Sequence, residues 1–322
     1  MPTPHSMRLF PPRRQRGAAL LTAMIIVTLV ATLAAAMVWQ QWRAVQVESA
    51  ERARAQAAWI LSGALDFARL ILKETVGRGK PTTLTDPWAT PLAEARLSTF
   101  LAVDKANADD GPEAFLSGNI NDAQARYNLT NLVNQGTVDP AELETLERLC
   151  QIAGVDTGVA QRIANGLRDA LGATTGAAGA AAPLLPQTIA QLGWLGIDPN
   201  SIQALAPYVV LFRPGTPVNV NTASREVLAA VIKGLDLGTA ERLVQLRQRA
   251  PFRDLDGFAR EVAGPAPLTA KLAVTSSFFE VRSRLRLVDR VLVERTLVQR
   301  QQNGQVDVLQ RERVASLEAA GG

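Results

Sequence analysis

The feature that most constrains this chain of 322 residues is an uncharged, apolar segment from Ala18 to Val38, close to its N-terminus. At about 1.5 Å per residue, a helix of this length measures roughly 30 Å, which matches the hydrocarbon core of a bilayer. Such a helix must lie in lipid or be covered by protein on every side. We therefore predict that residues 18–38 span a membrane.

A basic leader runs directly into this segment and ends with Arg13, Arg14, Arg16 and Gly17. Three interpretations are open. A secretory signal peptide would be cut near the small residues 34–36, whereas a signal anchor needs only the span and the arginines on its cytoplasmic side. A short basic leader that ends in Gly beside a long apolar helix also resembles a type IV prepilin-like signal. Such a signal is cut before the apolar segment, so the span stays on the mature protein.

The leader carries all of the chain's excess positive charge. The whole chain has 34 Lys and Arg and 30 Asp and Glu, and four of the arginines lie in residues 1–17, which hold no acid. Residues 18–322 therefore carry 30 bases and 30 acids. Because nucleic-acid binding depends on clustered surplus cations, we do not expect a nucleic-acid partner.

Scarce residue types argue against an enzyme. His5, the only histidine, lies in the leader, and Cys150 is the only cysteine. A chain that loses residues 1–17 cannot form a Ser-His-Asp triad, a Cys-His pair or a His-ligated metal site. We expect no catalytic residue, and we expect Cys150 to be a small buried side chain in an amphipathic helix.

The apolar segment is predicted to begin a much longer helix. Trp39 and Trp42 follow it where an interfacial aromatic belt is expected, and no proline or paired glycine interrupts the chain before Gly77. The helix would have about 59 residues and a length on the order of 90 Å. Its second part, residues 39–77, has one apolar stripe, which we expect to pack on the protein's own domain.

A mixed region is predicted after this helix. It begins with a loop around Asp86-Pro87-Trp88, which is followed by a short helical run from about Ala93. Weak strand signals near residues 114–120 and 125–129 then predict a two-strand hairpin. The turn between them is marked by Asn119, Asn121 and Asp122.

Residues 133–275 are predicted to form an inserted α-helical domain. Two similar segments in it, Gly154–Ile163 and Gly234–Leu243, each indicate two helices joined by a tight glycine turn. The second copy resembles the helix-hairpin-helix of DNA-binding and competence proteins. The alternative function is therefore a membrane-tethered DNA-binding protein of the competence type.

The two turns carry a carboxylate where a bound phosphate would lie. Asp156 and Asp236 would repel a phosphate at the N-terminus of the following helix. Aspartate is, however, a preferred residue for capping such an N-terminus. We therefore favour structural helical hairpins over a DNA-binding interpretation.

The C-terminal region is predicted to be β. Alternation in residues 278–287 places apolar side chains inward and arginines outward, and Asn303-Gly304 predicts a hairpin turn between two further strands. The outward arginines have two interpretations. They form a basic docking patch, or a solvated strand face with Glu294 and Glu312 as cross-strand neighbours.

These elements predict an α+β fold in which a pilin-like long helix packs on an antiparallel sheet that carries a large all-α insertion with helix-hairpin-like units. The predicted order of regions is leader 1–17, transmembrane segment 18–38, amphipathic helix 39–77, first α+β part 78–132, insertion 133–275, C-terminal strands 276–313 and tail 314–322.

Four segments in this order carry a resemblance to a known family: Arg14–Val27, Asp86–Trp88, Asp122–Leu132 and Asn219–Leu228. Together they resemble the general secretion pathway protein K family, the large minor pseudopilins of type II secretion systems. The resemblance implies a non-enzymatic subunit that forms and caps the tip of a short periplasmic pseudopilus. That pseudopilus supports protein export across the outer membrane.

The resemblance also implies sites, location and partners. Prepilin peptidase would cut after Gly17, and Ala18 would then be N-methylated. The protein would cross the inner membrane once, with its N-terminus cytoplasmic and its C-terminal domain periplasmic. Its partners would be minor pseudopilins I and J, then H, the major pseudopilin, prepilin peptidase and inner-membrane lipid.

No cofactor is required by this resemblance, although some relatives hold structural calcium. Asp104, Asp109, Asp110 and Asp122 are weak candidates for its ligands, because no ordered loop spacing links them. The fifth mature position departs from the general pilin pattern. It is Thr22, where most pilins carry a glutamate that neutralises the N-terminal ammonium of an adjoining subunit. Our hypothesis is that Thr22 suits a tip subunit with none above it.

Overall fold

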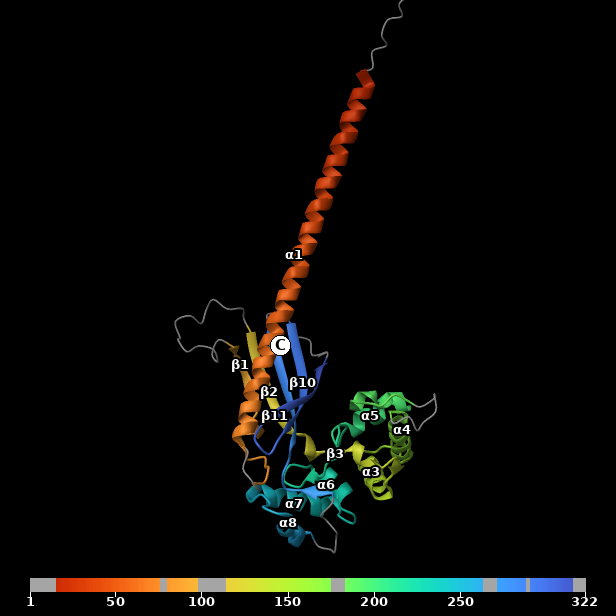
Figure 1. Cartoon of the computed structure of the whole chain (residues 1–322), viewed down its shortest axis with the longest axis vertical. Helices are drawn as coiled ribbons and strands as arrows, with labels where there is room; N and C mark the ends of the chain where they lie inside the picture. Colours follow the sequence, from red (N-terminus) through yellow and green to blue (C-terminus); the bar gives the residue numbers. More distant parts are fainter. Residues whose placement is uncertain are drawn as a thin grey trace, which may run out of the picture. The chain divides into compact units, whose positions relative to one another are not determined.

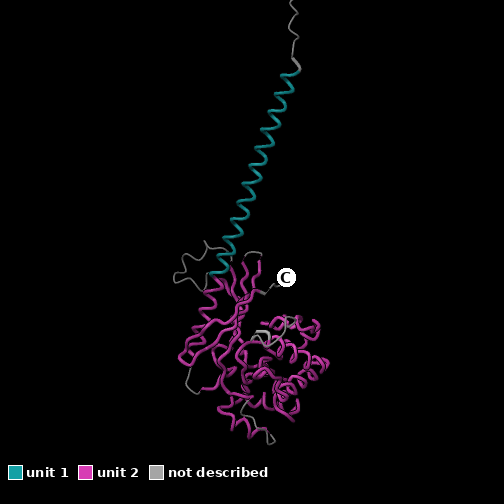
Figure 2. Tube along the Cα trace, turned by 45° about the vertical axis from the view of Figure 1, so that its right-hand side comes forward, with its two compact units in different colours: residues 1–59 teal, residues 60–322 magenta. Residues whose placement is uncertain are grey.

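The computed structural model describes residues 16–75, 80–97, 114–174, 183–262, 271–287 and 290–314. It divides the chain into two compact units, Met1–Trp59 and Ile60–Gly322, which Figure 2 shows in different colours, while Figure 1 labels the helices and strands. The first unit is helical in its described part, and the second contains the sheet and the helical insertion.

Helix α1 (Arg16–Glu74) is continuous over 59 residues, which confirms the predicted single long helix. Large apolar side chains between Leu20 and Val38 are more than half exposed, so the first unit leaves the predicted span uncovered. Among the described residues, this is the one helix long and apolar enough to cross a membrane. At the end of the span, the Arg43 guanidinium lies 4.2 Å from the Trp39 ring centroid.

A five-stranded antiparallel sheet organises the second unit. Its order is β1-β2-β9-β10-β11, so strands from before and after the helical insertion are neighbours. The three C-terminal strands and the turn at Gly304, which has a φ of 85°, are as predicted. The strands are β1 (Leu92–Arg96), β2 (Ala114–Asp122), β9 (Phe278–Leu287), β10 (Arg290–Arg300) and β11 (Val306–Val314).

One face of this sheet is covered by the last part of α1. Leu65, Ala68 and Leu72 recur at helical spacing and enter a buried cluster with Phe279 and other sheet residues. Trp88 closes the cluster, with its ring centroid 5.3 Å from that of Phe279 in an edge-to-face arrangement. The predicted α+β class, with a helix on an antiparallel sheet, is confirmed.

Two local predictions before the insertion are wrong. The run from Ala93 begins in strand β1 rather than in a helix, and its part from residue 98 onward lies outside the described residues. The expected hairpin between residues 114 and 129 does not form. Strand β2 continues through the supposed turn as far as Asp122, because its partners are β1 and the distant β9. Residues Tyr127–Asn128 (β3) pair instead in parallel with Val209–Val210 (β6).

The expected role of Glu294 is also wrong. It lies opposite Ser283, on the sheet face away from the outward arginines, and its side chain is only 4% exposed. There it pairs with Arg311 at 3.3 Å and Arg313 at 3.8 Å. The physical reason is the register of β10 against β9, because a difference of one position moves a strand residue to the opposite face.

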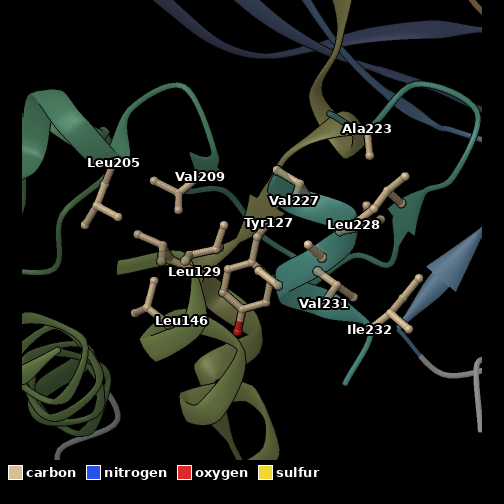
Figure 3. Close-up of a cluster of buried hydrophobic side chains, with 14 of the residues drawn as sticks. Tyr127, Leu129, Leu146, Leu205, Val209, Ala223, Val227, Leu228, Val231 and Ile232 are labelled. Carbon is tan, nitrogen blue, oxygen red and sulfur yellow. The ribbon is translucent and has the colours of Figure 1, made fainter. Parts of the chain in front are cut away.

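The helical insertion has its own core, which extends from Tyr127 to Leu272 (Figure 3). The two predicted helical hairpins are α3–α4 and α6–α7, and Arg148 Nε donates to Ala230 O at 2.6 Å, linking α3 to α6. The helices are α3 (Pro140–Ile152), α4 (Gly158–Thr174), α5 (Pro199–Leu205), α6 (Arg225–Val231), α7 (Leu237–Arg249) and α8 (Leu255–Glu261). The short elements are η1 (Pro87–Ala89), η3 (Ala123–Ala125), η4 (Leu129–Leu132), η5 (Ile189–Leu195), β4 (Val133–Asn134), β5 (Thr137–Val138), β7 (Val218–Asn219) and β8 (Leu272–Ala273).

The sheet generates a prediction at Gly118 of β2. A Cβ atom there would lie 2.6 Å from Arg282 O of the neighbouring strand. We expect Gly118→Ala to lower the free energy of unfolding by about 1–3 kcal/mol, because the strands must move apart. Thermal unfolding of the full chain in detergent measures this effect.

Gly63→Ala is the matched control. Gly63 lies in α1, and beyond the nearby backbone of its own helix no atom lies within 4 Å of the position that an added methyl group would take. Alanine there should be neutral or stabilise the helix by up to about 1 kcal/mol. Equal melting temperatures for the two variants would contradict the close strand approach at Gly118.

Candidate functional site

A buried polar junction ties the sheet to the helical insertion, and Asp122 is at its centre. Asp122 Oδ2 accepts hydrogen bonds from Ser276 Oγ at 2.6 Å, Thr222 Oγ1 at 2.6 Å and Asn219 Nδ2 at 3.0 Å. Its other oxygen, Oδ1, accepts from the Gln124 backbone N–H at 2.8 Å. Asp122 ends β2, Ser276 precedes β9, and the other side chains come from the insertion, so one carboxylate joins three parts of the chain.

Burial and polar contacts shift the pKa values of the junction's ionisable groups in opposite directions. Asp122 is only 4% exposed, and its burial raises the pKa of the carboxyl, while the four hydrogen bonds act to lower it. Burial likewise lowers the pKa of the Arg300 guanidinium, and the nearby carboxylates of Asp122 and Asp86 act to raise it. Removing one charged side chain from this junction should destabilise the fold, because the charge that remains would be buried without a partner.

Arg300 connects the junction to the end of α1. Its Nη1 donates to Thr75 Oγ1 at 3.0 Å, and its Nη2 donates to Ser276 O at 2.9 Å and to Thr82 Oγ1 at 3.2 Å. The guanidinium also lies 4.7 Å from the Phe279 ring centroid. This one side chain therefore fixes the helix end, the following loop and the sheet together.

The Asp86-Pro87-Trp88 loop is held beside the junction by its own aspartate. Asp86 accepts from the Thr83 backbone N–H at 2.9 Å and from Trp88 Nε1 at 3.3 Å, and it pairs with Lys80 at 3.0 Å. These bonds hold Trp88 in the core under α1. Thr82, next to this loop, offers its carbonyl to Asn219 Nδ2 at 3.1 Å.

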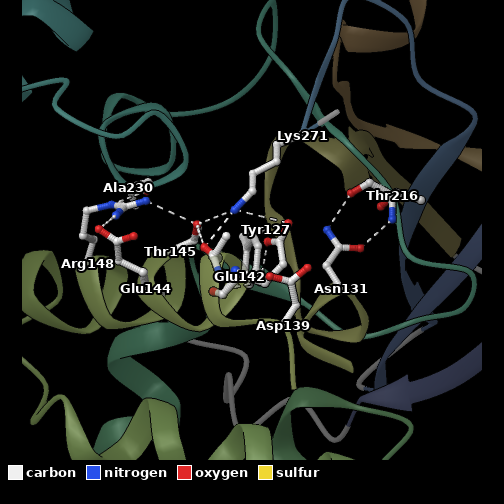
Figure 4. Close-up of polar contacts among 11 residues, drawn as sticks. Tyr127, Asn131, Asp139, Glu142, Glu144, Thr145, Arg148, Thr216, Ala230 and Lys271 are labelled. Carbon is white, nitrogen blue, oxygen red and sulfur yellow. Dashed lines mark hydrogen bonds and ion pairs between the residues drawn. The ribbon is translucent and has the colours of Figure 1, made fainter. Parts of the chain in front are cut away.

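A second group of polar contacts anchors the start of the insertion (Figure 4). Asn131 Oδ1 accepts from the Thr216 backbone N–H at 2.9 Å. On α3, Glu142 accepts from the Tyr127 hydroxyl at 2.9 Å and pairs with Lys271 at 3.3 Å. Burial, with help from the Glu142 charge, raises the pKa of Tyr127. Side-chain contacts thus connect the segment after Asp122 and the start of α3 to the distant segments that contain Thr216 and Lys271. No long series of strand hydrogen bonds makes this connection in the described residues.

The two helical hairpins have aspartates at their turns, as predicted. Asp156 accepts from the Gly158 backbone N–H at 2.9 Å, and Asp236 accepts from the Thr239 N–H at 2.9 Å. The glycines before them, Gly154 and Gly234, have φ values of 70° and 83°. The N–H groups that a phosphate would use are therefore engaged by carboxylates, so the DNA-binding alternative is not favoured.

The predicted processing residues lie in the first turns of α1. Helix α1 includes Gly17 and Ala18, and the Thr22 hydroxyl donates to the Ala18 carbonyl at 2.8 Å. Thr22 therefore satisfies its own hydrogen bond within its helix and presents no carboxylate. Cys150 is fully buried as expected, and burial raises the pKa of its thiol to about 11.

Three of the four candidate calcium ligands, Asp104, Asp109 and Asp110, lie in residues 98–113, outside the described residues. Asp122 is described, and it accepts four hydrogen bonds from protein donors. Within the described ranges, no group of three or more His, Cys, Asp or Glu side chains is placed to hold a metal ion.

Sequence reasoning misses Ser276, Thr82 and Arg300 as members of the junction. Each has an ordinary local context, a loop or a strand end, and each acquires its role from residues far along the chain. The segments Asp122–Leu132 and Asn219–Leu228 stand out by their patterns. Their contact through Asp122 and Asn219 cannot be deduced from either one alone.

Comparisons with known proteins match this architecture. A family described as "Type II secretion system (T2SS), protein K" matches residues 218–276, and a second model of that description matches residues 125–214. Type II secretion system protein K of Pseudomonas aeruginosa is 29% identical over 93% of each chain. That of Pectobacterium carotovorum subsp. carotovorum is 28% identical over 93% of this chain and 96% of its own.

A solved structure shares the fold. It is a chain of the GspK-GspI-GspJ complex from the enterotoxigenic Escherichia coli type 2 secretion system, with a TM-score of 0.63 and 22% identity. The match covers 83% of this chain and 99% of that one. The fold of the matched part of this chain thus occurs in a known protein.

The junction generates a prediction at Asp122. Asp122→Asn keeps the shape but turns one acceptor oxygen into an N–H donor facing other donors. We expect a loss of about 2–4 kcal/mol in the free energy of unfolding. Denaturation of the full chain in detergent, followed by tryptophan fluorescence, measures it.

Asp169→Asn, at an exposed ion pair with Arg168, is the control and should change stability by less than about 1 kcal/mol. Equal losses would rule out a special role for the junction.

The hairpin turns generate a pH prediction at Asp236. The Thr239 backbone N–H and hydroxyl lower the pKa of Asp236 below its ordinary value. Its capping contribution is therefore present above the ordinary aspartate pKa of about 3.9 and is lost as the pH falls through the lowered value. We expect Asp236→Ala to lower the melting temperature more at pH 7 than at a pH below that range, where the carboxyl is neutral in both the folded and the unfolded state.

Asp236→Asn is the control for this titration, because an asparagine can cap the helix without changing charge. Its difference from Asp236→Ala should not vary with pH. A wild-type advantage that persisted unchanged into strong acid would show that the carboxylate charge does not stabilise the turn.

Proposed function

Because the chain belongs to the type II secretion system protein K family, we propose that this minor pseudopilin caps the tip of the periplasmic pseudopilus. In this role it is a non-enzymatic assembly subunit that supports protein export across the outer membrane. The observation that carries the proposal is the unbroken helix α1, which joins an uncovered apolar span to a stripe buried under the sheet. One helix of this kind can anchor the subunit in a membrane before assembly and then contact other subunits in a filament.

The place at the tip is supported by Thr22. A shaft subunit needs a carboxylate near the start of its helix to neutralise the N-terminal ammonium of its neighbour, because an unpaired charge in lipid is costly. The Thr22 hydroxyl donates to Ala18 O of its own helix instead. A subunit with no neighbour above it has no ammonium to neutralise, so the missing carboxylate does not destabilise it.

The proposed orientation and partners follow from the same helix and family. The leader arginines favour a cytoplasmic N-terminus by the positive-inside rule, which leaves the second unit in the periplasm. The proposed partners are the I- and J-type minor pseudopilins, then the H-type, the major pseudopilin, prepilin peptidase and inner-membrane lipid. No cofactor is required for this role, and structural calcium stays a prediction.

The experiment that tests the proposal is intact mass and N-terminal sequencing of the membrane-extracted protein, expressed with and without a prepilin peptidase. We expect a methylated N-terminus at Ala18 with the peptidase and an unprocessed Met1 without it. An N-terminus at Met37 in both would identify a secretory signal peptide, and Met1 in both would leave only a signal anchor. Either result would remove the basis for a pseudopilin.

A further inference from the structure

The sheet face opposite α1 carries a row of arginines that the proposed function does not use. Arg282, Arg284 and Arg286 of β9 alternate with Val281 and Leu285, which are buried on the other face. In β10, Arg295 lies directly opposite Arg282. Strand alternation therefore collects four guanidinium groups on one face within two neighbouring strands.

The pairing of Arg282 with Arg295 is unfavourable for the fold alone. Like charges directly opposite each other on adjacent strands destabilise a sheet. Arg295 reaches Glu280 at 3.4 Å, but Arg126 shares that glutamate at 2.9 Å. Arg282 is exposed and forms no ion pair with any residue in the described ranges.

The other two arginines both pair with an acid of the neighbouring sheet edge. Glu94 of β1 pairs with Arg284 at 2.9 Å and with Arg286 at 2.5 Å, and these arginines lower the pKa of Glu94. Among the described residues, Glu94 and Glu280 thus form the ion pairs of Arg126, Arg284, Arg286 and Arg295. Glu312 lies opposite Arg295 on β11, and Arg282 has no such acid in the described ranges.

The guanidinium groups of Arg284 and Arg286 are held in place rather than free in solvent. Arg286 lies 3.9 Å from the Phe115 ring centroid, and its side chain is 35% exposed, while that of Arg284 is 31% exposed. The strands from residue 276 to 314 contain arginines but no lysine. Ordered arginines beside an aromatic ring are typical of protein interfaces, because a rigid guanidinium binds a carboxylate in two places at little entropic cost.

We propose that this arginine face binds a carboxylate-rich surface of a neighbouring minor pseudopilin. Carboxylates from that subunit would neutralise Arg282 and relieve its repulsion of Arg295, so the face becomes favourable only in the complex. The proposal rests on the proposed function, because it names the surface by which the subunit meets its partner. The alternative ligand is an anionic membrane surface. Mobile lipid headgroups are better matched by flexible lysine side chains than by ordered arginines, so we favour a protein partner.

The test is capture of the I- and J-type subunits by the full chain, co-expressed in the membrane and extracted in mild detergent. We compare wild type with Arg282→Glu/Arg295→Glu. The control is Arg249→Glu/Arg253→Glu, the same change of charge at two exposed residues of the insertion. We expect the first variant to lower the affinity at least about tenfold and the control to leave it within about twofold.

A second measurement keeps the test independent of misfolding. Arg282→Gln removes the repulsion, so its melting temperature should equal or exceed that of the wild type, whereas a lower value would mean that Arg282 stabilises the fold.

A photocrosslinker at Asn119, which lies opposite Arg282 on β2, should crosslink to an I- or J-type subunit. Crosslinks to lipid alone would overturn the proposal.

The two proposals fail in different ways. If the wild type captures neither subunit although all three are present and folded, the proposed function fails. If the wild type captures them and Arg282→Glu/Arg295→Glu does so equally well, only the arginine face is wrong.

Discussion

One buried carboxylate determines how the two halves of the second unit fit together. Asp122 receives donors from the strand end, from the insertion and from the segment before β9, and Arg300 extends the same network to the end of α1. Burying an aspartate is costly unless its oxygens accept hydrogen bonds. Three of the four donors to Asp122 come from residues far along the chain, so this network is complete only when the insertion and the segment before β9 are both in place.

The sequence predicts the features whose signals are local. Periodicity identifies α1, the αα-hairpins and the three closing strands, and the aspartates at Asp156 and Asp236 are correctly interpreted as caps. Prediction fails where the partner is distant. Strand β1 resembles a helix in composition, and Asn119 to Asp122 resembles a turn, because nothing nearby indicates that β9 will pair with β2. Ser276 and Arg300 are missed for the same reason.

The two faces of the sheet have different roles, and the alternation of strand residues separates them. One face is largely apolar where α1 covers it, and it also carries Glu294, which pairs with Arg311 and Arg313. The other places Arg282 directly opposite Arg295, at some cost to the isolated subunit. A protein that works only in an assembly can carry such a cost, because the assembled state, rather than the monomer, is the one that must be stable.

The adjacency of β2 and β9 also fixes an order of events during synthesis. The chain that links these strands is the whole helical insertion, which has a buried core of its own. Until β9 leaves the ribosome, β2 lacks its inner neighbour and the stripe of α1 has no finished sheet to cover it. The apolar stripe of α1 can therefore be covered by its sheet only late in translation.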